Sequence, residues 1–147
     1  MQRILIKISW EALAGEDWWL FDYWLIDNLV HSILTIHQRG IQTAIVCGAW
    51  NIWRQRDNQN LWIDRVKSDY LWMMWTVMNA VVINERLMQQ WIKWAVLCPS
   101  GLHVSPITKD YNALSARDEL DNWKVIFCAW WTWSPYATTD SAAVLRA

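Results

Sequence analysis

Glycine is scarce in this sequence, which contains four glycines among 147 residues. Average usage would place roughly ten glycines in a chain of this length. Tryptophan, the largest side chain, occurs 15 times. We interpret the two departures as one, in which tryptophan stands at positions that ordinarily need a residue without a side chain.

An excess of charge of one sign is also absent. The formal net charge is -1, the pI is about 6.3, and lysine and arginine are scattered among aspartate and glutamate. Proteins that bind nucleic acid or an anionic membrane surface ordinarily carry a basic field. We therefore expect small-molecule partners, with no nucleic acid and no membrane among them.

Cysteine is present without any pairing pattern. Cys47, Cys98 and Cys128 are widely spaced, form no C-x-x-C pair, and each closes an apolar run. This pattern favours buried thiols in a reducing cytoplasm over disulfides or a metal site. The three histidines have no metal-ligand spacing either, so we expect no protein-bound metal.

Long hydrophobic runs are missing as well. The N-terminus lacks the charged region, apolar stretch and cleavage site of a secretory signal. The most lipid-like segment, Tyr70 to Ile83, is shorter than the roughly 20 residues of a spanning helix and is interrupted by Asn79. We expect a cytoplasmic protein in which this segment is a buried helix.

The hydrophobic pattern alternates between the two regular structures along the chain. Strands are expected at residues 3–9, 41–47, 92–98 and 124–129. Helices are expected at 21–39, at 64–90 with a break or kink, at 110–120, and from 139 to the end at 147. This alternation predicts an α/β fold, a three-layer αβα sandwich with a mostly parallel central sheet and right-handed crossovers. The length predicts one domain over residues 1–147.

Ligands of such sheets bind at the carboxyl ends of the strands, which directs attention to residues 9–15, 48–54 and 130–140. The end of the first strand and its loop read Lys7-Ile-Ser-Trp-Glu-Ala-Leu13. The second loop reads Gly48-Ala-Trp-Asn-Ile-Trp-Arg54. The third segment reads Ala129-Trp-Trp-Thr-Trp-Ser-Pro-Tyr-Ala-Thr-Thr-Asp-Ser-Ala-Ala143. Between them stands Asp69-Tyr-Leu-Trp-Met-Met-Trp-Thr-Val-Met-Asn79. These ordered motifs resemble those of bacterial-type uridylate (UMP) kinases of the amino-acid-kinase superfamily, and the resemblance covers the whole chain.

The resemblance implies the amino-acid-kinase fold and transfer of the γ-phosphoryl group of ATP to UMP, with Mg²⁺ accompanying ATP. Lys7 and Asp140 would be catalytic, Lys7 stabilising the migrating phosphoryl group and Asp140 orienting Lys7. ATP would contact Lys7, Ile8, Ser9, Trp10, Trp50 and Arg54. UMP would contact Ala49, Asp69, Thr132, Trp133, Ser134, Pro135, Tyr136, Ala137, Thr138 and Thr139.

This chemistry needs positioned phosphates and neutralised charge more than covalent help from the protein. Glycine-rich loops present backbone N–H groups to phosphates because they allow close approach, often at positive φ. No general base is needed, since the acceptor phosphate is already anionic near neutral pH.

The resemblance also implies a homohexamer, activation by GTP and inhibition by UTP. The loop from Gly15 to Leu20 matches the region of GTP activation only loosely, because Leu20 replaces a frequent glycine. The last helix has only begun at Ala147, so we expect the chain to be the front part of a longer protein whose C-terminal ATP-binding portion is not included.

Several of these residues also have a purely structural explanation. In isolation, Lys7 is also explained as a solvated strand-end lysine, and Asp69 or Asp140 as an acid favoured near a helix N-terminus. Met73, Met74 and Met78 are interpreted as packing in the core or at a subunit interface. Other functions left open are a superfamily kinase with a carboxylate or carbamate acceptor, and a non-catalytic nucleotide-binding protein on the same fold.

Ten tryptophans coincide with glycines of the family. A tryptophan forced into a tight turn costs on the order of 1 to 3 kcal/mol, so ten would rival the roughly 5 to 15 kcal/mol that stabilise a domain. Some bacterial lineages translate the UGA codon as glycine. We hypothesise that these tryptophans are UGA codons that were read as tryptophan instead of glycine. Trp53 stands where the family has an aromatic residue, so we interpret it as authentic. The ten are Trp10, Trp18, Trp50, Trp62, Trp72, Trp91, Trp123, Trp130, Trp131 and Trp133.

Overall fold

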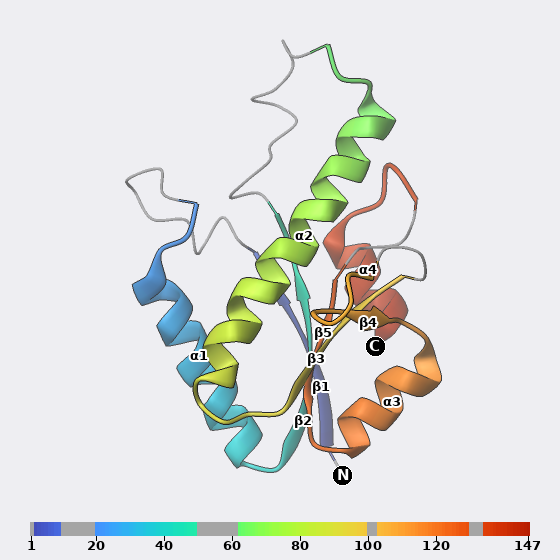
Figure 1. Cartoon of the computed structure of the whole chain (residues 1–147). Helices are drawn as coiled ribbons and strands as arrows, with labels where there is room; N and C mark the ends of the chain where they lie inside the picture. Colours follow the sequence, from blue (N-terminus) through green and yellow to red (C-terminus); the bar gives the residue numbers. More distant parts are fainter. Residues whose placement is uncertain (1, 10–19, 50–61, 100–102, 130–133) are drawn as a thin grey trace.

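The computed structural model describes residues 2–9, 20–49, 62–99, 103–129 and 134–147. Strands and helices follow one another along the chain, and Figure 1 shows their arrangement. The elements are β1 (Gln2–Ile8), α1 (Tyr23–Gln38), β2 (Ile41–Cys47), α2 (Arg65–Met88), β3 (Trp94–Cys98), β4 (Lys109–Asp110), α3 (Ala113–Asp121), β5 (Val125–Cys128) and α4 (Thr139–Arg146).

The five strands form one sheet in the order β1-β2-β5-β3-β4, and every strand pair in it is parallel. Helices α1 and α2 lie on one face of this sheet and α3 and α4 on the other (Figure 1). The predicted three-layer α/β architecture is therefore confirmed. The parallel pairing brings the carboxyl ends of β1, β2 and β5 to one edge of the sheet.

The central strands are apolar on both faces, as a doubly covered parallel sheet requires. In β5, Val125 and Phe127 belong to the core cluster shared with α1 and the C-terminal half of α2. The alternate residues Ile126 and Cys128 belong to the cluster that Ala116 of α3 and Ala142 of α4 complete. Two cores thus hold the sheet between its helical layers.

Polar side chains begin the helices where the sequence places them. Asp22 and Asp64 accept hydrogen bonds from the first backbone N–H groups of α1 and α2, and Asn112 and Thr138 do the same for α3 and α4. Such caps satisfy N–H groups that have no partner within the helix.

Three expectations need correction. The helix expected at 64–90 is one unbroken helix, because Arg65–Met88 contains neither proline nor glycine to interrupt it. The helix expected at 110–120 begins only at Ala113, because Asp110 pairs with β3 in the short strand β4 and Asn112 caps the helix. The strand expected at 92–98 begins at Trp94.

Residues with positive φ angles follow the ends of α1 and α3. Gly40 follows the C-cap of α1 with φ 74°, and Trp123 follows the C-cap of α3 with φ 56°. The N–H groups of Trp123 and Lys124 donate to the carbonyls of Leu120 and Glu119 at 2.9 and 3.0 Å. This pairing is a Schellman motif, whose left-handed position is usually glycine.

The helices in the described part of the chain are each too short or too polar to span a lipid bilayer.

Candidate functional site

The ends of β1 and β2 are joined by backbone contacts. The N–H of Gly48 donates to the carbonyl of Ile8 at 3.0 Å, and Ile8 and Ala49 are buried while Ser9 is exposed. The buried side chain of Asn79 on α2 donates to the carbonyl of Gly48 at 2.8 Å. The start of the second loop is therefore held between its neighbouring strand and α2.

The structure brings Lys7 and Asp140 together, although most of the chain separates them. The Nζ of Lys7 lies 3.0 Å from Oδ1 of Asp140, which is in the first turn of α4. Lys7 is a partly exposed side chain at the end of β1, and Asp140 is exposed. An exposed ion pair adds little to the stability of the fold. Its effect here is to hold the ammonium of Lys7 in one place, where solvent and ligands can reach it.

A second group of residues links α2 to the segment before α4. The buried carboxylate of Asp69 accepts the backbone N–H of Tyr136 at 2.9 Å and the Nε of Arg65 at 3.2 Å. The guanidinium of Arg65 lies 5.5 Å from the ring centroid of Tyr136, within the range of a cation–π contact. Tyr136 has φ 67°, so Asp69 and Arg65 hold a residue in a left-handed conformation.

The segment 134–139 leads into the N-terminus of α4. Thr138 caps the helix by accepting the N–H of Ser141 at 3.2 Å, and Thr139 is buried. Ala137 packs against the core, whereas Ser134, with its hydroxyl 3.3 Å from the carbonyl of Pro135, is exposed. A helix N-terminus beside a lysine favours negative charge.

Several predicted contact residues lie outside the described residues: Trp10, Trp50, Arg54, Thr132 and Trp133. The described candidates fall into the two groups above, one around Lys7 and one around Asp69. They come from the carboxyl ends of β1 and β2, the start of α2, and the segment before α4.

Two residues of the site were not among the predicted ones. Arg65 stands one helical turn before Asp69, so its spacing could have indicated an i,i+4 ion pair. Asn79 closes the motif that contains Asp69, but only its contact with Gly48 reveals what the side chain does. Sequence spacing alone carries no information on that contact.

The buried cysteines and the cavity of the described chain do not belong to these two groups of residues. Burial raises the pKa of Cys128 to about 11 and also raises that of Cys98, so both buried thiols stay protonated. Within the described part of the chain, no three His, Cys, Asp or Glu side chains are grouped to hold a metal. A cavity of about 330 Å³ lies between β1, α3 and the end of α4, lined by none of the predicted site residues.

The chain is similar to solved UMP kinases. It superposes on UMP kinase from Ureaplasma parvum with a TM-score of 0.91 and 29% identity over 99% of its own length, and on UMP kinase from Bacillus anthracis with a TM-score of 0.92 and 28% identity over 99%. It spans 63% and 59% of those two chains. No protein-family model matches the chain. In fold and in sequence, the chain thus resembles the corresponding part of UMP kinases over almost all of its length.

Proposed function

We propose that this chain provides the phosphate-acceptor side and part of the ATP-phosphate cradle of a UMP kinase, which converts ATP and UMP into ADP and UDP. One observation carries the proposal: the Lys7–Asp140 pair stands at the carboxyl edge of a sheet that superposes on UMP kinases. The whole protein would act with Mg²⁺ bound to ATP.

The proposed roles of these residues follow from their charges and from their positions near the proposed phosphate site. Lys7 would neutralise charge that develops on the migrating phosphoryl group, and Asp140 would hold its ammonium in place. The N-terminus of α4, next to Lys7, adds a positive dipole end. Because the acceptor is itself a phosphate, these residues only need to align the reactants and offset repulsion.

The Asp69 group would shape the UMP side. By holding the backbone of Tyr136, Asp69 fixes the segment that the resemblance assigns to UMP. Arg65 offers an additional cation beside that segment. Mg²⁺ would be held mainly by nucleotide phosphates and water, which are its usual ligands in such reactions. Cytoplasmic location, a homohexamer, GTP activation and UTP inhibition remain predictions from the resemblance.

The test is UDP formation by a protein of UMP kinase length that carries this chain with glycine at the ten family positions. Lys7→Ala is expected to lower kcat by about 100-fold or more, as loss of a transition-state contact does, with UMP affinity nearly unchanged. Lys93→Ala, an exposed lysine before β3, is the matched control and should leave kcat unchanged.

Phosphorylation of glutamate or carbamate in preference to UMP would replace the proposal with another superfamily kinase. UMP binding without turnover would favour the non-catalytic alternative.

A further inference from the structure

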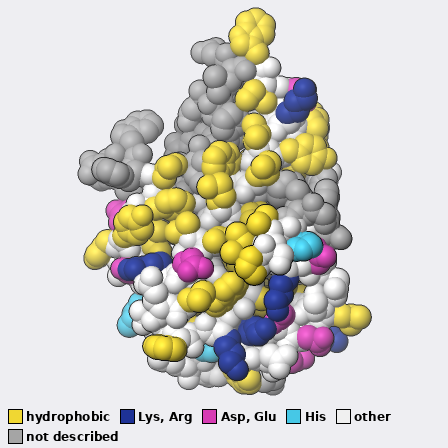
Figure 2. Space-filling model, in the orientation of Figure 1, with side chains coloured by type: hydrophobic (Ala, Val, Ile, Leu, Met, Phe, Trp, Pro, Cys, Tyr) yellow, Lys and Arg dark blue, Asp and Glu magenta, His cyan; other side chains and the backbone are white. Residues whose placement is uncertain are grey.

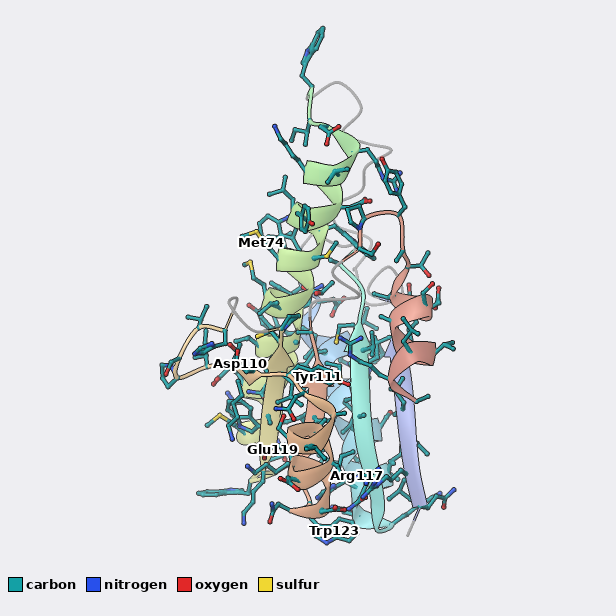
Figure 3. All side chains as sticks on the ribbon, turned by 90° about the vertical axis from the view of Figure 1, so that its right-hand side faces the viewer. Met74, Asp110, Tyr111, Arg117, Glu119 and Trp123 are labelled. Carbon is teal, nitrogen blue, oxygen red and sulfur yellow. The ribbon has the colours of Figure 1, made fainter. Side chains whose placement is uncertain are left out.

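One arginine contacts both of the residues that shape the proposed UMP side. The Nε of Arg65, in the first turn of α2, lies 3.0 Å from Oδ1 and 3.2 Å from Oδ2 of Asp69. Its guanidinium carbon lies 5.5 Å from the ring centroid of Tyr136. Figure 1 and Figure 3 both show the segment that leads into α4 rising alongside the first turns of α2. A single side chain thus connects the helix to this segment, although the resemblance gives that side chain no role.

Tyr136 needs contacts that hold it in place. Its φ of 67° is a left-handed conformation, which is unfavourable for a residue with a Cβ. The residue is 70% exposed, so burial in the core contributes little to holding it. Its backbone N–H donates to Oδ2 of Asp69 at 2.9 Å, and the guanidinium of Arg65 stands beside its ring. The conformation of Tyr136 therefore depends on two side chains of α2.

The carboxylate of Asp69 depends in turn on a cation. Asp69 is only 7% exposed. A charge taken out of water is costly unless it is paired. Arg65 supplies the pairing through Nε, which reaches both carboxylate oxygens, and Oδ2 also accepts the N–H of Tyr136. Loss of Arg65 would therefore weaken the hydrogen bond to Tyr136 as well as the contact with its ring.

The Lys7–Asp140 pair is held by other contacts. Asp140 lies in α4, which is capped by Thr138 and anchored in the core by Ala142. These contacts keep Asp140 beside Lys7 even when the preceding segment moves. Arg65 should therefore affect the binding of the acceptor more than the transfer of the phosphoryl group.

We propose that Arg65 is a positioning residue that sets the affinity for UMP by holding Asp69 and Tyr136 in the shape that receives the nucleotide, an inference that rests on the proposed function. A guanidinium suits this task because its N–H edge pairs with a carboxylate while its flat face lies against a ring. The ammonium of a lysine is a point charge and cannot make both contacts at once.

A second cation at the start of α2 provides a matched control. Figure 2 shows Lys or Arg side chains at this end of the helix, beside hydrophobic ones. Lys67 is exposed and stands two residues after Arg65, so it projects from a different side of the helix. Its removal changes the charge of the region by the same amount without touching the contacts of Arg65.

The test measures UDP formation against UMP concentration, with the protein of UMP kinase length that carries glycine at the ten family positions. Arg65→Gln is expected to raise KM for UMP about tenfold and to change kcat by less than about twofold, as loss of uniform binding does. Arg65→Lys should recover little of the affinity, because charge alone does not replace the two contacts. Lys67→Gln should leave KM and kcat unchanged.

A double-variant cycle tests whether Arg65 acts through the tyrosine ring. Tyr136→Leu alone should raise KM for UMP. Its combination with Arg65→Gln should raise KM by less than the product of the two single effects, because both changes remove the same contact. Tyr136→Phe, which keeps the ring, should behave like the unaltered protein.

The outcomes separate this role of Arg65 from the proposed function. UDP formation with an unchanged KM in Arg65→Gln, full rescue by Arg65→Lys, or equal effects of Arg65→Gln and Lys67→Gln would overturn the positioning role alone. An unaltered protein that forms no UDP would contradict the proposed function. Calorimetry of UMP binding would then decide on Arg65, since equal affinities or no binding would overturn its role. Circular dichroism checks folding, which should persist because the Arg65 side chain is 47% exposed.

Discussion

Trp62 and Trp91 have φ angles of 54° and 62° and are 99% and 95% exposed, so neither is held by packing. Trp123, with φ 56°, occupies the same position after α3 that Gly40 occupies after α1. All three are among the tryptophans predicted to stand at family glycines. The fourth described member of that set, Trp72, is buried within α2 and helical. The described tryptophans outside the set, Trp24, Trp75 and Trp94, have no positive φ.

Replacing the exposed left-handed tryptophans should stabilise the chain. Trp62→Gly and Trp91→Gly are each expected to raise the free energy of unfolding by about 1 kcal/mol, because a left-handed conformation costs a residue with a Cβ about that much. Trp24→Gly, at an exposed position in the first turn of α1, should instead lower it by up to about 1 kcal/mol. Urea denaturation of the three variants measures the difference. Destabilisation by all three substitutions would contradict the conformational argument.

Contacts of Glu119 join separate elements. The carboxylate of Glu119 on α3 lies 2.6 Å from the ammonium of Lys109 on β4 and also pairs with Lys124 just before β5. Burial of this side chain, which is 13% exposed, raises its pKa, but hydrogen bonds and charges from the two lysines outweigh burial. The pKa of Glu119 is therefore below its ordinary value of 4.5.

This lowered pKa makes the attachment of α3 dependent on pH. The stabilising contribution of Glu119 is fully present above about pH 4.5 and is lost as the pH falls through the folded-state pKa, because the unfolded chain binds the proton first. Glu119→Gln is expected to lower the free energy of unfolding by about 1 kcal/mol at pH 7, and this difference should shrink in acid. Chemical denaturation from pH 7 to pH 3 measures it, with the exposed neighbour Asp118→Asn as control. A difference independent of pH would contradict the ion-pair explanation.

Across the whole molecule, the tryptophans at glycine positions are concentrated around the proposed ligand loops. Trp10 and Trp50 fall in the segments assigned to ATP phosphates, and Trp130, Trp131 and Trp133 surround Thr132 in the segment assigned to UMP. Bare backbone is what a phosphate needs to approach N–H groups closely. Ordinary substitution would not replace glycine there while retaining Lys7 and Asp140.

The codons of the gene test the hypothesis that these tryptophans come from UGA codons for glycine. We expect UGA codons at the ten tryptophans that coincide with family glycines and UGG at Trp53. Sequencing the gene decides the matter, and UGG at all of these positions would rule out the decoding hypothesis.

The sequence by itself predicted the four helices and all but β4 of the strands that the structure describes, and it indicated the edge of the sheet where ligands would bind. Strand Ile41–Cys47 has the predicted bounds, because a buried parallel strand is a short apolar run ended by turn residues. The parallel topology in turn predicts a site at the carboxyl ends. Local periodicity supports these predictions because it depends only on residues close in sequence.

Only the tertiary structure decided which distant residues meet. The resemblance implied that Asp140 orients Lys7, but their 3.0 Å approach, like the hydrogen bond from Tyr136 to Asp69, requires the sheet order and the packing of α2 and α4. Likewise, periodicity did not separate buried Met73 from exposed Met74 and Met78, because α2 is apolar on both sides. Which side of the helix faces the core is decided by the sheet against which it packs.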